Sequence, residues 1–165
     1  MALSGITNRL INVDILTTDY RIVGKVLVGN SGLFGLLTDN TRTLIEVRQA
    51  QMAYTSLPNR LVHRMGTMLV MKKRIFVACL EHREDVGPLA IAHRGYTQYQ
   101  RYPLYIGASQ FEIKLNLEWT GRFDLNSMVA ENIASFIPGY DAVITSPVLP
   151  DVAIQSEAVL VNLSC

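Results

Sequence analysis

Alternating hydrophobic and polar positions dominate the chain and predict short β-strands. The clearest case is FEIKLNLE, residues 111–118, in which apolar side chains occupy every second position. A period of two is typical of a half-buried strand. The same pattern predicts a hairpin over 8–29 around the polar turn TTDY, in which Gly24 marks a bulge or a sharp bend. Further strands are expected within 43–55, on both sides of a Lys-Lys pair in 65–82, in a hairpin over 102–119, and within 140–146 and 152–163.

Helical patterns are short. Residues 33–41 predict one helical turn or a wide loop, and residues 122–136 predict a short helix. No segment has the long amphipathic period of a surface helix. We therefore expect a mainly β fold made of many short strands with short helical turns.

Two distant segments repeat the same order of residue types. Gly32, Phe34 and Leu36 begin the first segment, and Gly121, Phe123 and Leu125 begin the second, at an offset of about 90. The apolar order and the turn residues also agree in the flanking segments. This pattern predicts an internal duplication, with a first β-barrel-like repeat over 1–83, a linker over 84–100 and a second repeat over 101–165.

The order of elements resembles the Sm-like fold, which includes bacterial RNA chaperones and the Sm proteins. The resemblance rests first on a bent strand with a glycine, IVGKVLV at 22–28, and on the apolar loop after it. It rests also on VHRMGTMLV at 62–70, which is similar to the Arg-Gly signature of the second Sm motif. Met65 separates the Arg from the Gly here, and 154–161 lacks both residues. The resemblance implies bent, barrel-like units that pair strand four with strand five, so that about three tandem chains close a ring. It also implies RNA binding near the pore, a function that the missing Arg-Gly places in doubt for the second half.

Composition favours an oligomer. Hydrophobic residues make up 49% of the 165 residues and charged residues only 18%, which leaves apolar surface for subunit contacts. The net charge of +1 excludes the overall basic excess of many nucleic-acid-binding proteins. The chain shows neither a secretory pattern nor a membrane-length apolar run, so we expect a cytoplasmic protein without membrane contact.

The sequence offers no catalytic or metal-binding motif. The two cysteines are too few for a disulfide framework, and Cys79 within IFVACL is expected to be a buried hydrophobe. His82 lies among charged residues with His93 downstream, a composition that favours a solvated linker over a carboxylate–histidine metal site. Since no nucleophile or phosphate-loop motif is present, we expect no enzyme activity, no cofactor and no metal.

A segment rich in tyrosine and arginine is the most unusual local feature. It comprises Arg94, Tyr96, Tyr99, Arg101, Tyr102 and Tyr105. Aromatic and guanidinium groups in this pattern favour a subunit interface, base stacking with phosphate contacts, or internal packing, and the three interpretations stay open.

A basic run, MKKR at 71–74, is placed by the pattern at a hairpin tip. Lys72, Lys73 and Arg74, together with Arg64, would form either a charged soluble turn or a modest basic patch. The sequence therefore predicts a homo-oligomeric scaffold or binding module that assembles through strand edges. The alternative is RNA or single-stranded nucleic-acid binding through the Tyr/Arg segment and the basic tip.

Overall fold

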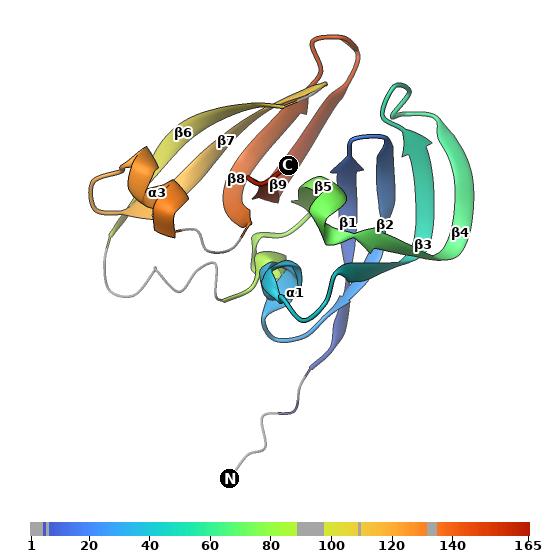
Figure 1. Ribbon diagram of the computed structural model, residues 1–165, viewed down its shortest axis with the longest axis horizontal. Helices are drawn as coiled ribbons and strands as arrows, with labels where there is room; N and C mark the ends of the chain where they lie inside the picture. Colours follow the sequence, from blue (N-terminus) through green and yellow to red (C-terminus); the bar gives the residue numbers. More distant parts are fainter. Residues whose placement is uncertain (1–4, 6, 89–97, 109, 132–134) are drawn as a thin grey trace.

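The computed structural model describes residues 5, 7–88, 98–108, 110–131 and 135–165. Within these residues the protein is mainly β and forms one open antiparallel sheet of nine strands, in the order β4-β3-β2-β1-β5-β9-β8-β7-β6. The strands are β1 (Arg9–Thr17), β2 (Tyr20–Val28), β3 (Leu44–Tyr54), β4 (Leu61–Met71), β5 (Ile75–Leu80), β6 (Tyr99–Ala108), β7 (Phe111–Thr120), β8 (Phe136–Thr145) and β9 (Ala153–Asn162). Figure 1 shows a bent sheet with β4 and β6, the two ends of the strand order, on opposite sides of the molecule.

The expected strands and short helices are present. The alternating segments form the hairpins β1–β2 and β6–β7, and the remaining predicted strands correspond to β3, β4, β5, β8 and β9. Two single helices follow β2 and β7, namely α1 (Gly32–Thr38) and α3 (Leu125–Glu131). Two 3₁₀ turns, η1 (Lys72–Arg74) and η2 (Arg83–Val86), flank β5. The mainly β prediction is thus confirmed.

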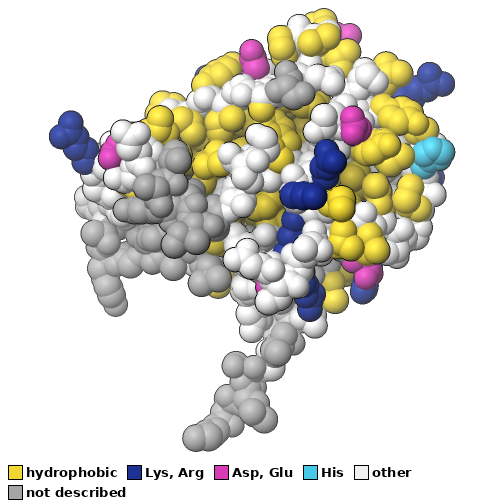
Figure 2. Space-filling model, in the orientation of Figure 1, with side chains coloured by type: hydrophobic (Ala, Val, Ile, Leu, Met, Phe, Trp, Pro, Cys, Tyr) yellow, Lys and Arg dark blue, Asp and Glu magenta, His cyan; other side chains and the backbone are white. Residues whose placement is uncertain are grey.

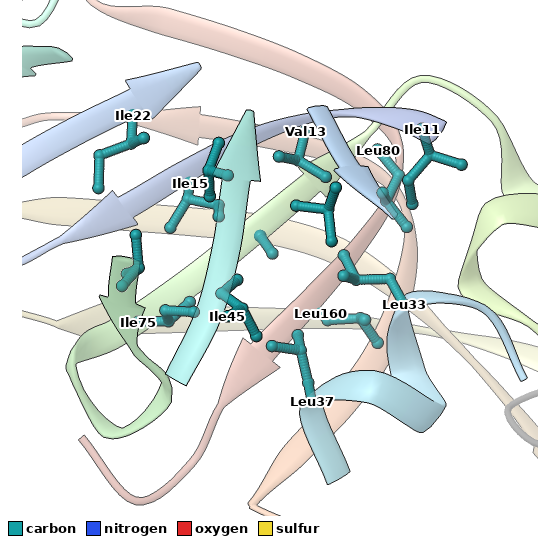
Figure 3. Packing of buried hydrophobic residues seen from close by; sticks show 14 of the residues in the cluster. Ile11, Val13, Ile15, Ile22, Leu33, Leu37, Ile45, Ile75, Leu80 and Leu160 are labelled. Carbon is teal, nitrogen blue, oxygen red and sulfur yellow. The ribbon is translucent and has the colours of Figure 1, made fainter. Parts of the chain in front are cut away.

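The central strand β5 serves two hydrophobic cores. All six of its residues are buried, because one face packs into each core. Ile75, Ala78 and Leu80 belong to the core of the first half, together with side chains of β1, β2, β3 and α1 (Figure 3). Val77 and Cys79 belong to the core of the second half, which contains the alternating apolar face of β7. The sequence left open whether the halves close separately, and the structure gives one continuous sheet.

The two halves share their element order and two backbone features. Each contains a hairpin, a short helix and two further strands, and the first half has β5 in addition. Gly32 and Gly121, which follow β2 and β7, have φ values of 65° and 77°. Gln49 in β3 and Asp141 in β8 both have φ of 50°, where the pairing with β2 and with β7 shifts register.

Each register shift is a β-bulge that bends the sheet. Gln49 and Ala50 lie together opposite Gly24, and Asp141 and Ala142 lie together opposite the corresponding residue of β7. The expected irregularity at Gly24 is therefore confirmed, although the extra residue belongs to β3. Both alanines are buried, with exposed fractions of 1% and 2%. The common pattern is a residue in the left-handed region followed by a buried alanine.

The basic run does not form a hairpin tip, and this prediction was wrong. β4 pairs with β3, whereas β5 pairs with β1 and β9, so the strands on either side of η1 are not neighbours in the sheet. Alternation along the sequence identifies strands but not their partners. The pairing is decided by which apolar faces can share one core.

Candidate functional site

β4 and β6 are the two strands that have a single partner in the described sheet. Such an edge presents unpaired backbone N–H and C=O groups, which form a template for pairing with another strand. β4 runs for eleven residues, pairs with β3 over most of its length and contains no proline.

The β4 edge is unusually apolar for an exposed strand. Leu61, Leu69 and Met71 have exposed fractions of 45%, 62% and 47%, and Leu69 and Met71 occupy alternate positions, so these two share one face. Leu44 of β3, which lies opposite Met71, is exposed to 41%. Figure 2 shows hydrophobic side chains gathered over the part of the molecule formed by β3 and β4. We call the set Leu44, Leu61, Leu69 and Met71 the β4 patch.

The register defines which backbone groups of β4 face the open edge. The Lys72 amide donates to the Thr43 carbonyl at 3.0 Å, and the pairs from Leu44–Met71 to Met52–His63 continue that register. Hydrogen-bonded pairs alternate in an antiparallel ladder. Even-numbered residues from 68 to 72 therefore face β3, and Thr67, Leu69 and Met71 direct their N–H and C=O groups outward.

The β6 edge is interrupted by a proline at its centre. Pro103 lies opposite Asn116 of β7. A proline is tolerated inside a strand where its nitrogen faces away from the ladder. The missing donor therefore falls on the outer side of β6, and prolines in this position are a common protection against strand addition.

The tyrosines of β6 divide between its two faces. Tyr99 and Tyr105, exposed to 39% and 65%, share the outer face with Arg101. Tyr102 points to the opposite face, where its ring stacks on Phe123 at 4.9 Å between centroids and its hydroxyl donates to the Gly121 carbonyl at 3.1 Å. Internal packing thus accounts for Tyr102. Arg94 and Tyr96, the other members of the predicted segment, lie outside the described residues.

Arg101 belongs to a network of ion pairs. It lies 3.2 Å from Asp141 and 3.8 Å from Glu118. Arg83 also pairs with Glu118, whose side chain is only 7% exposed. The Arg83 guanidinium lies 4.0 Å from the centroid of the Tyr140 ring. Carboxylates of the protein therefore occupy this side of the Arg101 guanidinium, which a phosphate would otherwise contact.

The predicted basic residues are dispersed. Lys72 is buried and its Nζ donates to the Asp39 carbonyl at 2.7 Å; burial lowers the pKa of its ammonium group. Lys73 and Arg74 are exposed in η1, and Arg64 lies exposed at mid-β4, opposite Gln51. The structure does not gather these side chains into one continuous patch.

A polar cleft of about 1100 Å³ lies between the two halves. Its walls come from β1, β2 and β3 on one side and from β8 and β9 on the other, and both bulge residues, Gln49 and Asp141, line it. Arg21 pairs with Asp14 at 2.6 Å inside it, and that hydrogen bond raises the pKa of the guanidinium. The sequence gave no signal for this cleft, because its walls are far apart along the chain.

Other candidate chemistry is limited. Among the residues that the structure describes, no group of three His, Cys, Asp or Glu side chains is arranged to hold a metal ion, and His93 lies outside this set. No described helix is both long enough and apolar enough to cross a bilayer. Cys79 is buried as expected, and burial raises the pKa of its thiol, whereas Cys165 is exposed.

No family model, curated protein or solved structure matches this chain. Its function is therefore inferred from the sheet, its edges and its charges. The most prominent feature is the β4 edge, which the sequence predicted only in general terms, as an exposed strand edge.

Proposed function

We propose that this chain is a self-assembling scaffold or binding module without enzymatic activity, built from duplicated Sm-like units. The observation that carries the proposal is the β4 edge. An eleven-residue strand with an open ladder and three large exposed apolar side chains would promote uncontrolled aggregation unless a partner covers it. Assembly satisfies the ladder and buries the apolar side chains together.

Matching irregularities support the duplication. A glycine in the left-handed region precedes or begins the helical segment of each half, at Gly32 and Gly121. A bulge occurs at the corresponding point of β3 and β8, and in both cases the left-handed residue is not glycine. Left-handed residues other than glycine are uncommon, so their agreement in place and conformation argues for common descent of the halves more strongly than shared strand content does.

Strand order supports the Sm-like character. In the first half the order is β4-β3-β2-β1-β5, with η1 between β4 and β5. β9 is the fourth strand of the second half, as β4 is the fourth strand of the first. It pairs with β5, the fifth strand of the first half, from Val77–Val161 to Leu80–Ala158. This contact agrees with the strand-four to strand-five pairing that the resemblance implies, here within one chain.

Light scattering coupled to size-exclusion chromatography tests the proposal. We expect a discrete multimer whose mass does not fall between low and high salt, because backbone pairing and apolar contacts are weakly screened. A monomer at micromolar to millimolar concentration would overturn the proposal.

Nucleic-acid binding is the second candidate, and the observation that favours it is the alignment of Tyr99, Arg101 and Tyr105 on the outer face of β6. The paired carboxylates around Arg101 weaken this candidate. A fluorescent single-stranded oligonucleotide titrated over a salt series tests it, since phosphate contacts strengthen as salt falls. Undetectable binding at the lowest salt would exclude it.

A further inference from the structure

We propose that β4 binds an antiparallel β-strand of a partner protein, in the position that β5 has beside β9. The bound strand has the chemistry of β5, which is six residues long and apolar on both faces. The inference rests on the binding-module form of the proposed function. It adds the kind of partner and the register of the contact.

β4 and β9 are equivalent strands, and the two bulges fix their alignment. The bulges of β3 and β8 each contain a residue with φ of 50°. The residue before each bulge pairs with Thr67 of β4 in the first half and with Ala158 of β9 in the second. Residues 67–70 of β4 therefore correspond to residues 158–161 of β9.

The backbone groups of the two strands also point the same way. The hydrogen bond that sets the register at the end of β4 has an equivalent after β9, where the Leu163 amide donates to the Ser135 carbonyl at 2.8 Å. Because hydrogen-bonded pairs alternate, the even-numbered residues from 158 to 162 direct their N–H and C=O groups away from β8. Their equivalents in β4 include Thr67 and Leu69, whose groups face the open edge.

β5 occupies this side of β9. It runs antiparallel to β9 and pairs with it from Val77–Val161 to Leu80–Ala158. Both backbone groups of Leu80 face β9, since its amide donates to the Ser156 hydroxyl at 3.1 Å and its carbonyl accepts from that hydroxyl at 2.8 Å. The backbone groups that β9 offers to β5 are thus the equivalents of those that β4 leaves open.

The side chains of β4 are uncovered where those of β9 are buried. Leu160 is 0% exposed beside β5, whereas its equivalent Leu69 is 62% exposed. Val159 is fully buried too, whereas its equivalent Met68 is half-buried at the margin of the first core. A strand in the position of β5 would cover Met68 on one face and contact Leu69 on the other.

β5 also defines the chemistry of the bound strand. Its residues divide between the two cores, and none of them is charged. Beside β4, one face of the added strand extends the first core next to Met68 and Val70, where an unpaired polar side chain would be costly. β5 of a second copy cannot serve, since it has neighbours on both sides and all six of its residues are buried. The strand therefore belongs to a different protein.

A synthetic peptide of residues 72–81, KKRIFVACLE, is the probe, because its charged ends favour solubility. In the register of β5 on β9, its Cys79 lies opposite Met68. This pair is non-hydrogen-bonded, so its Cα separation of about 4.5 Å lies within the range that a disulfide spans.

The first experiment compares Met68→Cys with the matched control Leu69→Cys, both in a Cys165→Ser background and a glutathione redox buffer. We expect mass spectrometry to find the peptide disulfide in Met68→Cys and little of it in Leu69→Cys, whose side chain points to the other face. Non-specific coupling would favour the more exposed position 69, so an excess of the Leu69→Cys adduct would overturn the register.

Two variants test the contact without a cross-link. Thr67→Pro removes one outward N–H but no hydrogen bond to β3, and Leu69→Lys places a charge in the β4 patch. We expect each to raise the Kd of the fluorescently labelled peptide at least about tenfold, through a lost hydrogen bond or a desolvated charge. Gly107→Ala on the β6 edge, where a Cβ meets no atom within 4 Å, is the control and should leave the Kd unchanged. Circular dichroism checks the fold, and should one variant unfold, the other still decides.

Failure of this inference differs from failure of the proposed function. A wild-type multimer that binds no peptide, or whose binding survives both substitutions, would exclude the partner strand and leave self-assembly intact. A wild-type monomer that binds the peptide in the expected register would support the partner strand and exclude self-assembly. A monomer that binds no peptide would exclude both.

Discussion

Gly24 of β2 and Val47 of β3 approach so closely that a Cβ on Gly24 would lie 2.6 Å from Val47 Cγ1. In the second half the relationship is reversed. There Leu115 lies opposite the bulge of β8, and a Cβ on Gly139 would lie 2.9 Å from its Cδ1. In the first half the glycine lies on β2 and the large side chain on β3, whereas in the second half the large side chain lies on β7 and the glycine on β8. Both halves keep the bulge that bends the sheet.

Gly24→Ala should destabilise the protein more than Gly139→Ala. The new methyl of Gly24→Ala would also lie 2.8 Å from the Arg48 carbonyl oxygen, which belongs to the backbone and cannot turn away. At Gly139 the contacts come from the flexible end of Leu115. We expect a loss of about 2–3 kcal/mol for Gly24→Ala and about 1 kcal/mol for Gly139→Ala in urea unfolding. Equal losses would contradict this account of the bend.

Pro103→Val should open the second edge of the sheet. The substitution restores an outward N–H at the centre of β6, so both edges would then accept a strand. We expect species larger than those of the wild type in light scattering, and their proportion should rise with protein concentration. Tyr105→Val on the same strand is the control that adds no donor, and it should leave the mass unchanged.

Tyr102→Ala should cost stability, whereas Tyr105→Ala, at a side chain that is 65% exposed, should leave it nearly unchanged. Tyr102 loses the stacking contact with Phe123 and the hydroxyl bond to the Gly121 carbonyl. We expect at least about 1 kcal/mol of unfolding free energy from the aromatic contact. Thermal unfolding of both variants measures the difference, and a larger loss for Tyr105→Ala would refute the assignment of faces.

Only one thiol of the native protein should react quickly. Burial raises the pKa of both thiols, but Cys165 is exposed to a reagent whereas Cys79 is buried in the second core. Titration with a chromogenic disulfide should give about one thiol per chain before denaturation and two after it. Fast reaction of both in native buffer would show that the second core opens readily.

Lys72 should give the stability a pH dependence in alkaline solution. Burial lowers the pKa of Lys72 in the folded protein below the usual 10.5. At pH values between the folded and the unfolded pKa, the unfolded chain therefore binds more protons than the folded one. The free energy of unfolding that this group contributes rises with pH over that interval. Lys72→Met lacks this contribution. We expect the free energy of unfolding of the wild type to gain on that of the variant as pH approaches 10.5, measured by urea unfolding at several pH values. A constant difference would contradict the shifted pKa.

The sequence by itself determined the local elements of this protein. Alternation at Phe111, Ile113, Leu115 and Leu117 has a period that only a strand can bury on one face, and all four are buried in the structure. Glycine at position 24 signalled the bend because the partner strand leaves no room for a side chain. These features follow from interactions within a few residues or across one strand pair, so a linear pattern records them.

The candidate site depended on contacts that the sequence does not record. The spacing of Tyr99, Tyr102 and Tyr105 suggested one aromatic surface, but a strand sends alternate side chains to opposite faces and Tyr102 packs against Phe123. The basic run looked like a hairpin tip, yet its flanking strands belong to different parts of the sheet.

Only the tertiary structure decided which strands became edges. Leu69 and Val70 are neighbours in an apolar run, and the sequence does not say that one is 62% exposed and the other 4%. The two side chains point to opposite faces of β4, and only the face of Val70 is covered by the core. β4 lies at the end of the sheet because β5 pairs with β1 and β9 instead. Strand order depends on how distant apolar faces share a core, and that is a property of the whole chain rather than of any segment.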